Sequence, residues 1–151
     1  MTLDPQQLAR ASADALWADD QASQAMGMTL EKVAPGSATL SMTVRKDMVN
    51  GHDICHGGFI FTLADTAFAF ACNSHNLNAL ASGARIEFLA PGKFGDVLTA
   101  VATELSQGRR SGVYDAIVTN QDGKTIALFR GNSARIGGAL VDQSTGEIIN
   151  G

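Results

Sequence analysis

Two hydrophobic patterns divide the chain. Apolar and polar side chains alternate with a period of two over residues 38–45, which follow residues 29–33 across the turn Pro35-Gly36-Ser37. This pattern predicts a half-buried β-hairpin. Alternating segments return in the second half of the chain, where short turns containing glycine, proline or aspartate separate them. The later predicted strands cover residues 79–89, 97–105, 113–119 and 125–136.

A helix-length apolar run lies between these two groups of strands. It begins at Gly57-Gly58, continues to Cys72 and contains one charged residue, Asp65. The run is shorter than the roughly 20 apolar residues that span a bilayer and has a carboxylate at its centre, which indicates a helix buried inside a protein. The four later strands are joined by turns too short for parallel crossovers. We therefore expect an α+β fold with a curved, mainly antiparallel sheet wrapped around one long central helix.

The two ends of the chain carry weaker signals. Asp4-Pro5 opens a predicted amphipathic helix, and an N-terminal helical segment is expected over residues 1–26. Residues 137–151 are rich in glycine and polar residues, so a loose tail is expected there. With 151 residues, 45% of them hydrophobic, the chain suits one domain over residues 1–151.

Charge and cysteine content exclude several classes of function. The chain has 11 basic and 15 acidic residues, and no basic stripe or basic amphipathic helix, which argues against a nucleic-acid or membrane partner. The first residues lack the pattern of a signal peptide, so the two cysteines are expected to be reduced thiols in the cytoplasm. Zinc-binding patterns are tighter than the spacing of Cys55, His56, Cys72 and His75, so no metal is expected.

Asp65 is the first candidate for chemistry. A lone carboxylate on an apolar helix must be paired, protonated or used. From the residues alone, catalysis and a structural carboxylate satisfied by loop N–H groups or by Asn50 both remain open. Small and polar residues share the helix face of Asp65: Thr62, Thr66, Ala69 and Asn73. This stripe either lines a substrate slot or faces strand carbonyls or the helix of a second subunit.

The start of the helix is the second candidate. Its first N–H groups lack partners within the helix and lie at the positive end of the helix dipole, which suits a developing oxyanion. Glycine at Gly57 would let a substrate approach the backbone closely. The alternative is that Gly57-Gly58 only permits a tight entry into a crowded helix. Asn50 precedes a glycine, so it either forms a turn or hydrogen-bonds a ligand.

Taken together, these residues resemble a known family, the hot-dog fold acyl-CoA thioesterases, and most closely the type found in bacterial phenylacetic acid degradation. The resemblance covers nearly the whole chain. Its most specific part is Asn50, followed by His56-Gly57-Gly58 and then Asp65. Weaker parts of the match follow: Phe88-Leu89-Ala90-Pro91, Gly95-Asp96, Gly108-Arg109-Arg110, Val118 and Asp122-Gly123.

The resemblance implies a hydrolase that cleaves a CoA thioester without a cofactor, with phenylacetyl-CoA or a hydroxylated relative as the expected substrate. It implies a homotetramer built from dimers, with each site between two subunits. Asp65 would be the general base or the nucleophile, the Gly57 N–H would stabilise the oxyanion, and Asn50 and His56 would orient the reacting groups. From the residue alone, a His56 that caps the helix or packs in the loop remains open. Further candidates for substrate binding are Gly58, Thr66, Arg109, Arg110 and Ser111.

Spacing along the helix supports a shared site. Eight residues at about 1.5 Å each separate Gly57 from Asp65 by about 12 Å, whereas an oxyanion donor and a base must both lie within about 3 Å of the reacting atoms. One chain therefore cannot bring both to one carbonyl. Arg109 and Arg110 suit CoA phosphates because arginine offers several fixed donors, although two arginines in a turn can equally be solvated.

Two other functions remain open at this point. A non-catalytic acyl-CoA binding protein would use the same pocket without turnover. A hot-dog enoyl-CoA hydratase would use an acid and a histidine, and Asp47 and His52 have a suitable spacing, although their surroundings do not resemble the hydratase pattern.

Overall fold

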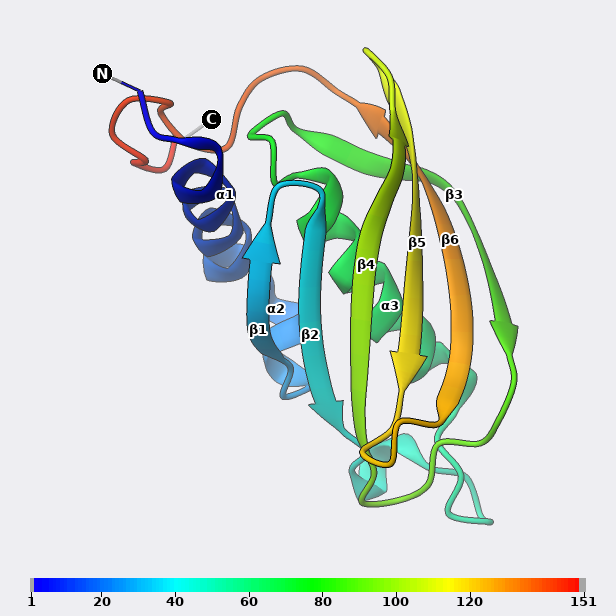
Figure 1. The fold of residues 1–151 in the computed structure, drawn as a ribbon. Helices are drawn as coiled ribbons and strands as arrows, with labels where there is room; N and C mark the ends of the chain where they lie inside the picture. Colours follow the sequence, from blue (N-terminus) through cyan, green and yellow to red (C-terminus); the bar gives the residue numbers. More distant parts are fainter. Residues whose placement is uncertain (1, 150–151) are drawn as a thin grey trace.

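Six strands form one antiparallel sheet that curves around helix α3 in the computed structural model, which describes residues 2–149 (Figure 1). The helices are α1 (Pro5–Asp19), α2 (Gln21–Ala25) and α3 (Gly57–Cys72), with a short 3-10 helix at Lys46–Met48. The strands are β1 (Thr29–Ala34), β2 (Ser37–Thr43), β3 (Ala79–Phe88), β4 (Val97–Gln107), β5 (Ser111–Thr119) and β6 (Thr125–Arg135). Their order in the sheet is β1-β2-β4-β5-β6-β3, and every neighbouring pair is antiparallel. The predicted architecture is confirmed.

Small side chains allow α3 to lie close to the centre of the sheet. Ala100 and Ala102 on β4 and Ala116 on β5 are fully buried beneath the helix. On β6, a Cβ atom at Gly131 would lie 2.8 Å from the ring of Phe68, so only glycine leaves room for that buried ring. The apolar helix predicted from the sequence is therefore the centre of the hydrophobic core.

Strand β3 is an edge of the sheet and is exposed along most of its length. It pairs with β6 on one side, with an irregularity in register between Ala81 and Gly83, and its other side has no neighbouring strand within residues 2–149. Leu80 and Phe88 are both more than half exposed. β3 thus presents a free row of backbone donors and acceptors, together with apolar side chains.

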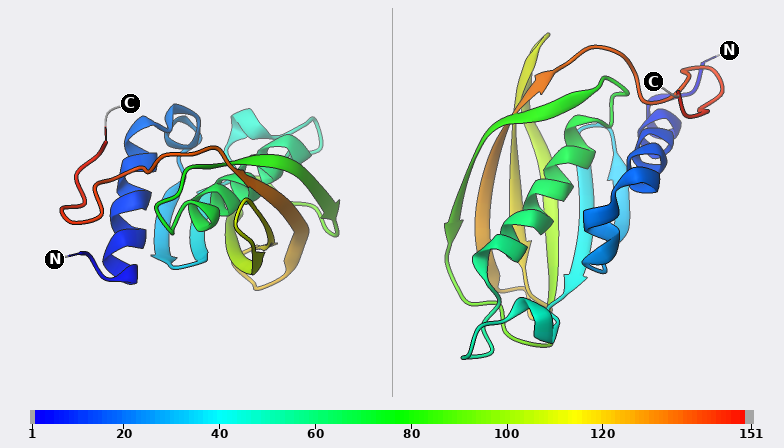
Figure 2. Two further views of the ribbon diagram at one scale, coloured as in Figure 1. Left: turned by 90° about the horizontal axis from the view of Figure 1, so that it is seen from above. Right: turned by 180° about the vertical axis from the view of Figure 1, so that it is seen from behind.

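The N-terminal helices cover the β1 end of the molecule, next to α3 (Figure 2). Asp4 caps α1, because its carboxylate accepts a hydrogen bond from Gln7 N at 2.8 Å while the Gln7 side chain accepts from Asp4 N. Asp20 ends α1 and begins α2. None of the helices in residues 2–149 is long and apolar enough to cross a membrane.

The tail differs from the loose segment expected at residues 137–151. Residues 137–149 have defined contacts, and the Val141 side chain is only 1% exposed. Asn76 fixes this segment, because its side chain accepts from Leu140 N and Val141 N and donates to Val141 O. The buried Val141 and the hydrogen bonds from Asn76 hold a stretch whose composition indicated a loose tail, together with Asn78, which donates to Gly137 O at 3.3 Å. Residues 150 and 151 of the predicted tail lie outside the described residues.

Candidate active site

Asp65 lies half-buried on α3 with no hydrogen-bond or ion-pair partner among residues 2–149. Burial raises the pKa of its carboxyl group, and the negative charge of Asp20 raises that pKa further. Asn50 and the loop N–H groups bind elsewhere, so the structure gives no support to a carboxylate satisfied by them. The Asp65 carboxylate is therefore available to a ligand.

The start of α3 is open to solvent on one side and crowded on the other. His56 is the N-cap residue, and its exposed side chain makes no capping hydrogen bond. A Cβ atom at Gly57 would lie 2.7 Å from Cζ of Phe88, whereas one at Gly58 would meet nothing within 4 Å. Gly57 thus allows Phe88 to pack on the helix, and Gly58 leaves free space beside the unpaired N–H groups of the first turn.

Asn50 is placed at the same end of α3 by the loop that precedes the helix. Val49 forms an isolated β-bridge with Cys55, and His56 N donates to Met48 O at 2.9 Å. The Asn50 side-chain oxygen accepts from His52 N at 2.9 Å and from Ile54 N at 3.2 Å.

The turn-forming role of Asn50 is therefore present. Its side-chain nitrogen donates to no other group among residues 2–149, so that nitrogen remains able to donate to a ligand. The structure brings together Asn50, His56, Gly57 and Gly58.

The other members of the polar stripe are engaged by the protein itself. The Thr62 hydroxyl donates to Gly58 O at 2.8 Å. The buried Thr66 hydroxyl donates to Thr62 O at 2.8 Å and lies 3.1 Å from the hydroxyl of Ser23 on α2. Asn73 joins the end of α3 to the start of β3 through two hydrogen bonds with Ala79. These contacts support a structural role for Thr62 and Asn73 rather than a role in lining a substrate slot.

Arg109 and Arg110 lie in the β4–β5 turn, at the end of the sheet opposite the start of α3 (Figure 1). Their side chains are exposed, and their carbonyl groups accept from the Arg135 side chain at 2.9 Å and from Arg135 N at 2.7 Å. Ser111 is the first residue of β5. Arg109, Arg110 and Ser111 therefore lie far from Gly57 of the same chain.

A polar cluster lies near the other end of α3. His75 Nε2 is 2.7 Å from the Glu104 carboxylate, which also accepts from the hydroxyl of the buried Tyr114 at 2.8 Å. Burial alone would raise the pKa of Glu104, but the hydrogen bonds from His75 and Tyr114 outweigh it and leave that pKa below its ordinary value. This cluster holds the C-terminal end of α3 to β4 and β5.

The cysteines and the hydratase pair take no part in this geometry. Cys55 and Cys72 are free and buried, and burial raises the pKa of their thiols to about 11 and about 12. Within residues 2–149, no group of three metal-binding side chains is present. Asp47 is exposed and bonds to Arg45 at 3.0 Å, and within residues 2–149 it makes no hydrogen bond with His52, whose N–H donates to Asn50.

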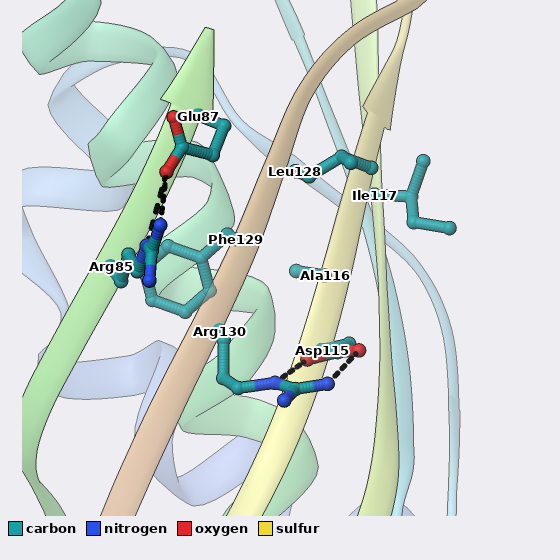
Figure 3. A pocket seen from close by; sticks show the side chains of 8 residues that line it. All are labelled: Arg85, Glu87, Asp115, Ala116, Ile117, Leu128, Phe129 and Arg130. Carbon is teal, nitrogen blue, oxygen red and sulfur yellow. Dashed lines mark hydrogen bonds and ion pairs between the residues drawn. The ribbon is translucent and has the colours of Figure 1, made fainter.

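A shallow pocket of about 330 Å³ lies on the opposite, outer face of the sheet (Figure 3). Two ion pairs border it: Arg85 with Glu87, and Arg130 with Asp115 at 2.6 Å. Sequence reasoning did not find this pocket, because strands far apart in the chain supply its residues. It is separated from Asp65 by the sheet and is not part of the site on α3.

Residues 52–127 match the model of the thioesterase superfamily. The chain is also 49% identical to the acyl-coenzyme A thioesterase PaaI of Escherichia coli K12 over 133 residues, which are 88% of this chain and 95% of that protein. The chain belongs to the thioesterase superfamily. The matched segment includes Gly57, Asp65 and Arg109, and thus most of the residues singled out above.

Solved structures of thioesterase-superfamily proteins agree with this fold. The E. coli PaaI protein from the phenylacetic acid degradation operon superposes with a TM-score of 0.89 at 48% identity, covering 90% of this chain and 99% of that one. A hypothetical thioesterase of Streptococcus pneumoniae TIGR4, solved with coenzyme A, has a TM-score of 0.72 at 28% identity and covers 74% of this chain and 88% of that one. The fold is the hot-dog fold, as the resemblance implied.

The sequence did not indicate three neighbours of the site. Phe88 belongs to the motif that ends the predicted strand, but its contact with Gly57 joins residues 31 positions apart and has no local signal. Asp20 and Ser23 lie next to the Asp65 face of α3. Their spacing is that of a helix N-cap, which indicates a helix start and gives no indication of what that helix packs against.

Proposed function

We propose that the chain hydrolyses acyl-CoA thioesters and that Asp65 carries the reaction as general base or as nucleophile. The observation that carries this proposal is a half-buried carboxylate with raised pKa that has no partner among residues 2–149. A catalytic base needs a proton affinity near its working range and a free side chain. Membership of the thioesterase superfamily and the name of the E. coli relative support the same reaction.

In the general-base route, a water oxygen attacks the thioester carbonyl carbon while Asp65 takes the proton. The carbon–sulfur bond then breaks, and the CoA thiolate leaves and is protonated. The N–H groups of Gly57 and Gly58 at the start of α3 would stabilise the oxyanion, since neither has a partner within the helix. The free side-chain nitrogen of Asn50 and the exposed His56 lie at the same end and would orient the thioester or the water.

We propose that each site is shared between two subunits of a homo-oligomer. The distance of about 12 Å along α3 keeps Gly57 and Asp65 of one chain from acting on one carbonyl. The unpaired side of β3 offers a surface for a second chain. If the β3 strands of two chains paired in antiparallel fashion, the start of α3 in one chain would lie toward the later part of α3 in the other. This arrangement would allow Gly57 of one chain and Asp65 of the other to act on one carbonyl. A tetramer would then be a pair of such dimers.

The same antiparallel pairing of two chains would bring residues suited to the CoA phosphates to the site. Arg109 and Arg110 lie far from Gly57 of their own chain, but the β4–β5 turn of a paired subunit would lie near it. Exposed arginine side chains are well suited to phosphate groups. Gly58 and Ser111 would complete the substrate contacts, whereas the buried Thr66 hydroxyl is held by Thr62 O and Ser23 and would support the site from behind.

The substrate proposed is phenylacetyl-CoA or a hydroxylated relative. The E. coli structure comes from a protein of the phenylacetic acid degradation operon, and that protein aligns with most of this chain. We also propose a cytoplasmic location, where two unpaired buried thiols stay reduced.

The test is release of free thiol from a panel of arylacetyl, benzoyl, short-chain and long-chain CoA esters, by the native protein and by Asp65→Asn. We expect thiol release that is fastest for arylacetyl esters and falls at least 100-fold in Asp65→Asn while ester binding persists. Binding without thiol release by the native protein would identify an acyl-CoA binding protein instead. Activity that survives Asp65→Asn would show that another group performs the chemistry.

A further inference from the structure

The corner between α1 and α2 is built around one carboxylate. Asp20 ends α1, where its N–H donates to Trp17 O at 3.2 Å, and it caps α2, where its carboxylate accepts from Ser23 N at 3.0 Å. The second carboxylate oxygen accepts from the Ser23 hydroxyl at 2.7 Å. Asp20 and Ser23 therefore bind each other through both backbone and side chain.

This corner is joined to α3 beside Asp65. The Ser23 side chain is 1% exposed and lies 3.1 Å from the hydroxyl of Thr66, which is 6% exposed. Thr66 is anchored in turn to its own helix through Thr62 O. Ser23 and Thr66 are therefore joined by a buried contact between their hydroxyl groups, and polar contacts run from Asp20 through Ser23 to the residue that follows Asp65.

The sheet places no charge beside Asp65 comparable to that of Asp20. Among the buried side chains of the sheet within residues 2–149, only Tyr114 and Ser133 are polar. On that side, the Glu104 carboxylate is bonded by His75 and Tyr114 near the C-terminal end of the helix.

On the helix itself, burial raises the pKa of the Cys72 thiol to about 12, so Cys72 is neutral at pH 7. Asp20 is the group whose negative charge acts on Asp65 and raises its pKa beyond the effect of burial. Two like charges in a partly buried setting favour the protonated form of one of them.

We propose that Asp20 is a positioning residue for Asp65: held through Ser23 and Thr66, it fixes the helix face that carries the base and keeps a second negative charge beside it. This proposal rests on the proposed function of Asp65. A base with a higher proton affinity accepts a proton from water more readily, provided that it remains ionised at the working pH. The N-terminal segment is then part of the catalytic unit as well as a cover for β1.

The chain offers a substitution that removes the charge and keeps the structure. Asparagine caps helices about as well as aspartate, so Asp20→Asn retains the cap on α2, whereas Asp20→Ala removes both charge and cap. Asp19→Asn is the matched control, because Asp19 is the preceding residue and its side chain is exposed. Ser23→Ala breaks the link to Thr66 and leaves the Asp20 charge in place.

The readout is the titration of the Asp65 carboxyl group, followed by carbon-13 NMR and assigned as the resonance missing from Asp65→Asn. We expect the midpoint in Asp20→Asn to fall by about half a pH unit or more, with no change in Asp19→Asn and an intermediate shift in Ser23→Ala. The acid limb of the pH profile of kcat/KM should move to lower pH by the same amount in Asp20→Asn.

An unchanged Asp65 midpoint in folded Asp20→Asn would overturn the proposal. So would an equal shift in Asp19→Asn, since the effect would then be a general one of net charge. Failure of the proposed function gives a different result, because Asp65→Asn would then keep its thioesterase activity whatever the titration shows. A purely structural role for Asp20 would lower stability in Asp20→Ala and leave both the midpoint and the pH profile of Asp20→Asn unchanged.

Discussion

Adjacent glycines at the start of α3 should respond differently to a methyl group. A Cβ atom at Gly57 would lie 2.7 Å from Cζ of Phe88, about 1 Å closer than carbon atoms pack. Phe88 is 52% exposed and lies at the end of β3, so its ring can turn into solvent. Losing its remaining burial costs about 1 kcal/mol, since full burial of such a side chain contributes roughly 1.5–3 kcal/mol.

Gly58→Ala meets nothing within 4 Å, and alanine is favoured over glycine in a helix by up to about 1 kcal/mol. We therefore expect Gly58→Ala to unfold at a urea concentration equal to or above that of wild type. Gly57→Ala gains the same helix preference, but the clash with Phe88 offsets it, so this variant should unfold at a lower urea concentration than Gly58→Ala. Both should lower kcat/KM for acyl-CoA esters, Gly58→Ala because its methyl group occupies the free space beside the first N–H groups.

The double variant Gly57→Ala/Phe88→Ala is the control, because the clash should disappear once the ring is removed. The destabilisation of the double variant should then be smaller than the sum of the two single changes. Equal unfolding midpoints for Gly57→Ala and Gly58→Ala, or additive effects in the double variant, would refute the packing role of Gly57. A fully active Gly58→Ala would refute the use of that space by substrate.

Three further outcomes are expected. Cys55 and Cys72 should react with a disulfide reagent at pH 8 about 100-fold more slowly than free cysteine until urea unfolds the chain. Glu104 stabilises the fold by about 1 kcal/mol; this stabilisation is complete above its unfolded pKa and is lost as the pH falls through its lowered folded pKa. Lowering the pH from about 6 to about 3 should therefore reduce the urea midpoint of wild type more than that of Glu104→Gln. Alanine at Arg109 or Arg110 should raise KM about tenfold for a CoA ester and leave it unchanged for the matching pantetheine ester, which lacks the nucleotide phosphates. Rapid thiol labelling, equal acid sensitivity or an equal KM change would contradict these expectations in turn.

Periodicity predicted the fold well because local patterns determine strands and helices. The apolar run at 57–72 gave the central helix with its observed bounds, and the short turns gave the antiparallel sheet. The β4–β5 turn was predicted to be longer than it is, since β5 already begins at Ser111. The tail was misjudged because its order comes from Asn76, 64 and 65 residues from the groups that it binds.

The sequence indicated which residues belong to the candidate site, but only part of their arrangement in space. Asp65 stood out because a charge on an apolar helix is costly, and Gly57 stood out because it begins that helix. The contact of Gly57 with Phe88 and the link from Thr66 to Ser23 join separate elements, so no local pattern could indicate them. The same limit holds for Arg109 and Arg110, whose separation from Gly57 follows from the directions in which β4 and α3 run (Figure 1).

The exposed edge of β3 also bears on how the protein behaves when its subunits separate. A strand of 10 residues with one unpaired side, apolar groups at Leu80 and Phe88 and no proline is a template for uncontrolled β-pairing. Arg85 and Glu87 are the charged residues on it that oppose such pairing. If two copies pair through this edge, association protects the chain from aggregation as well as completing the site. Dilution to single chains should then cause a loss of activity that reconcentration restores only in part.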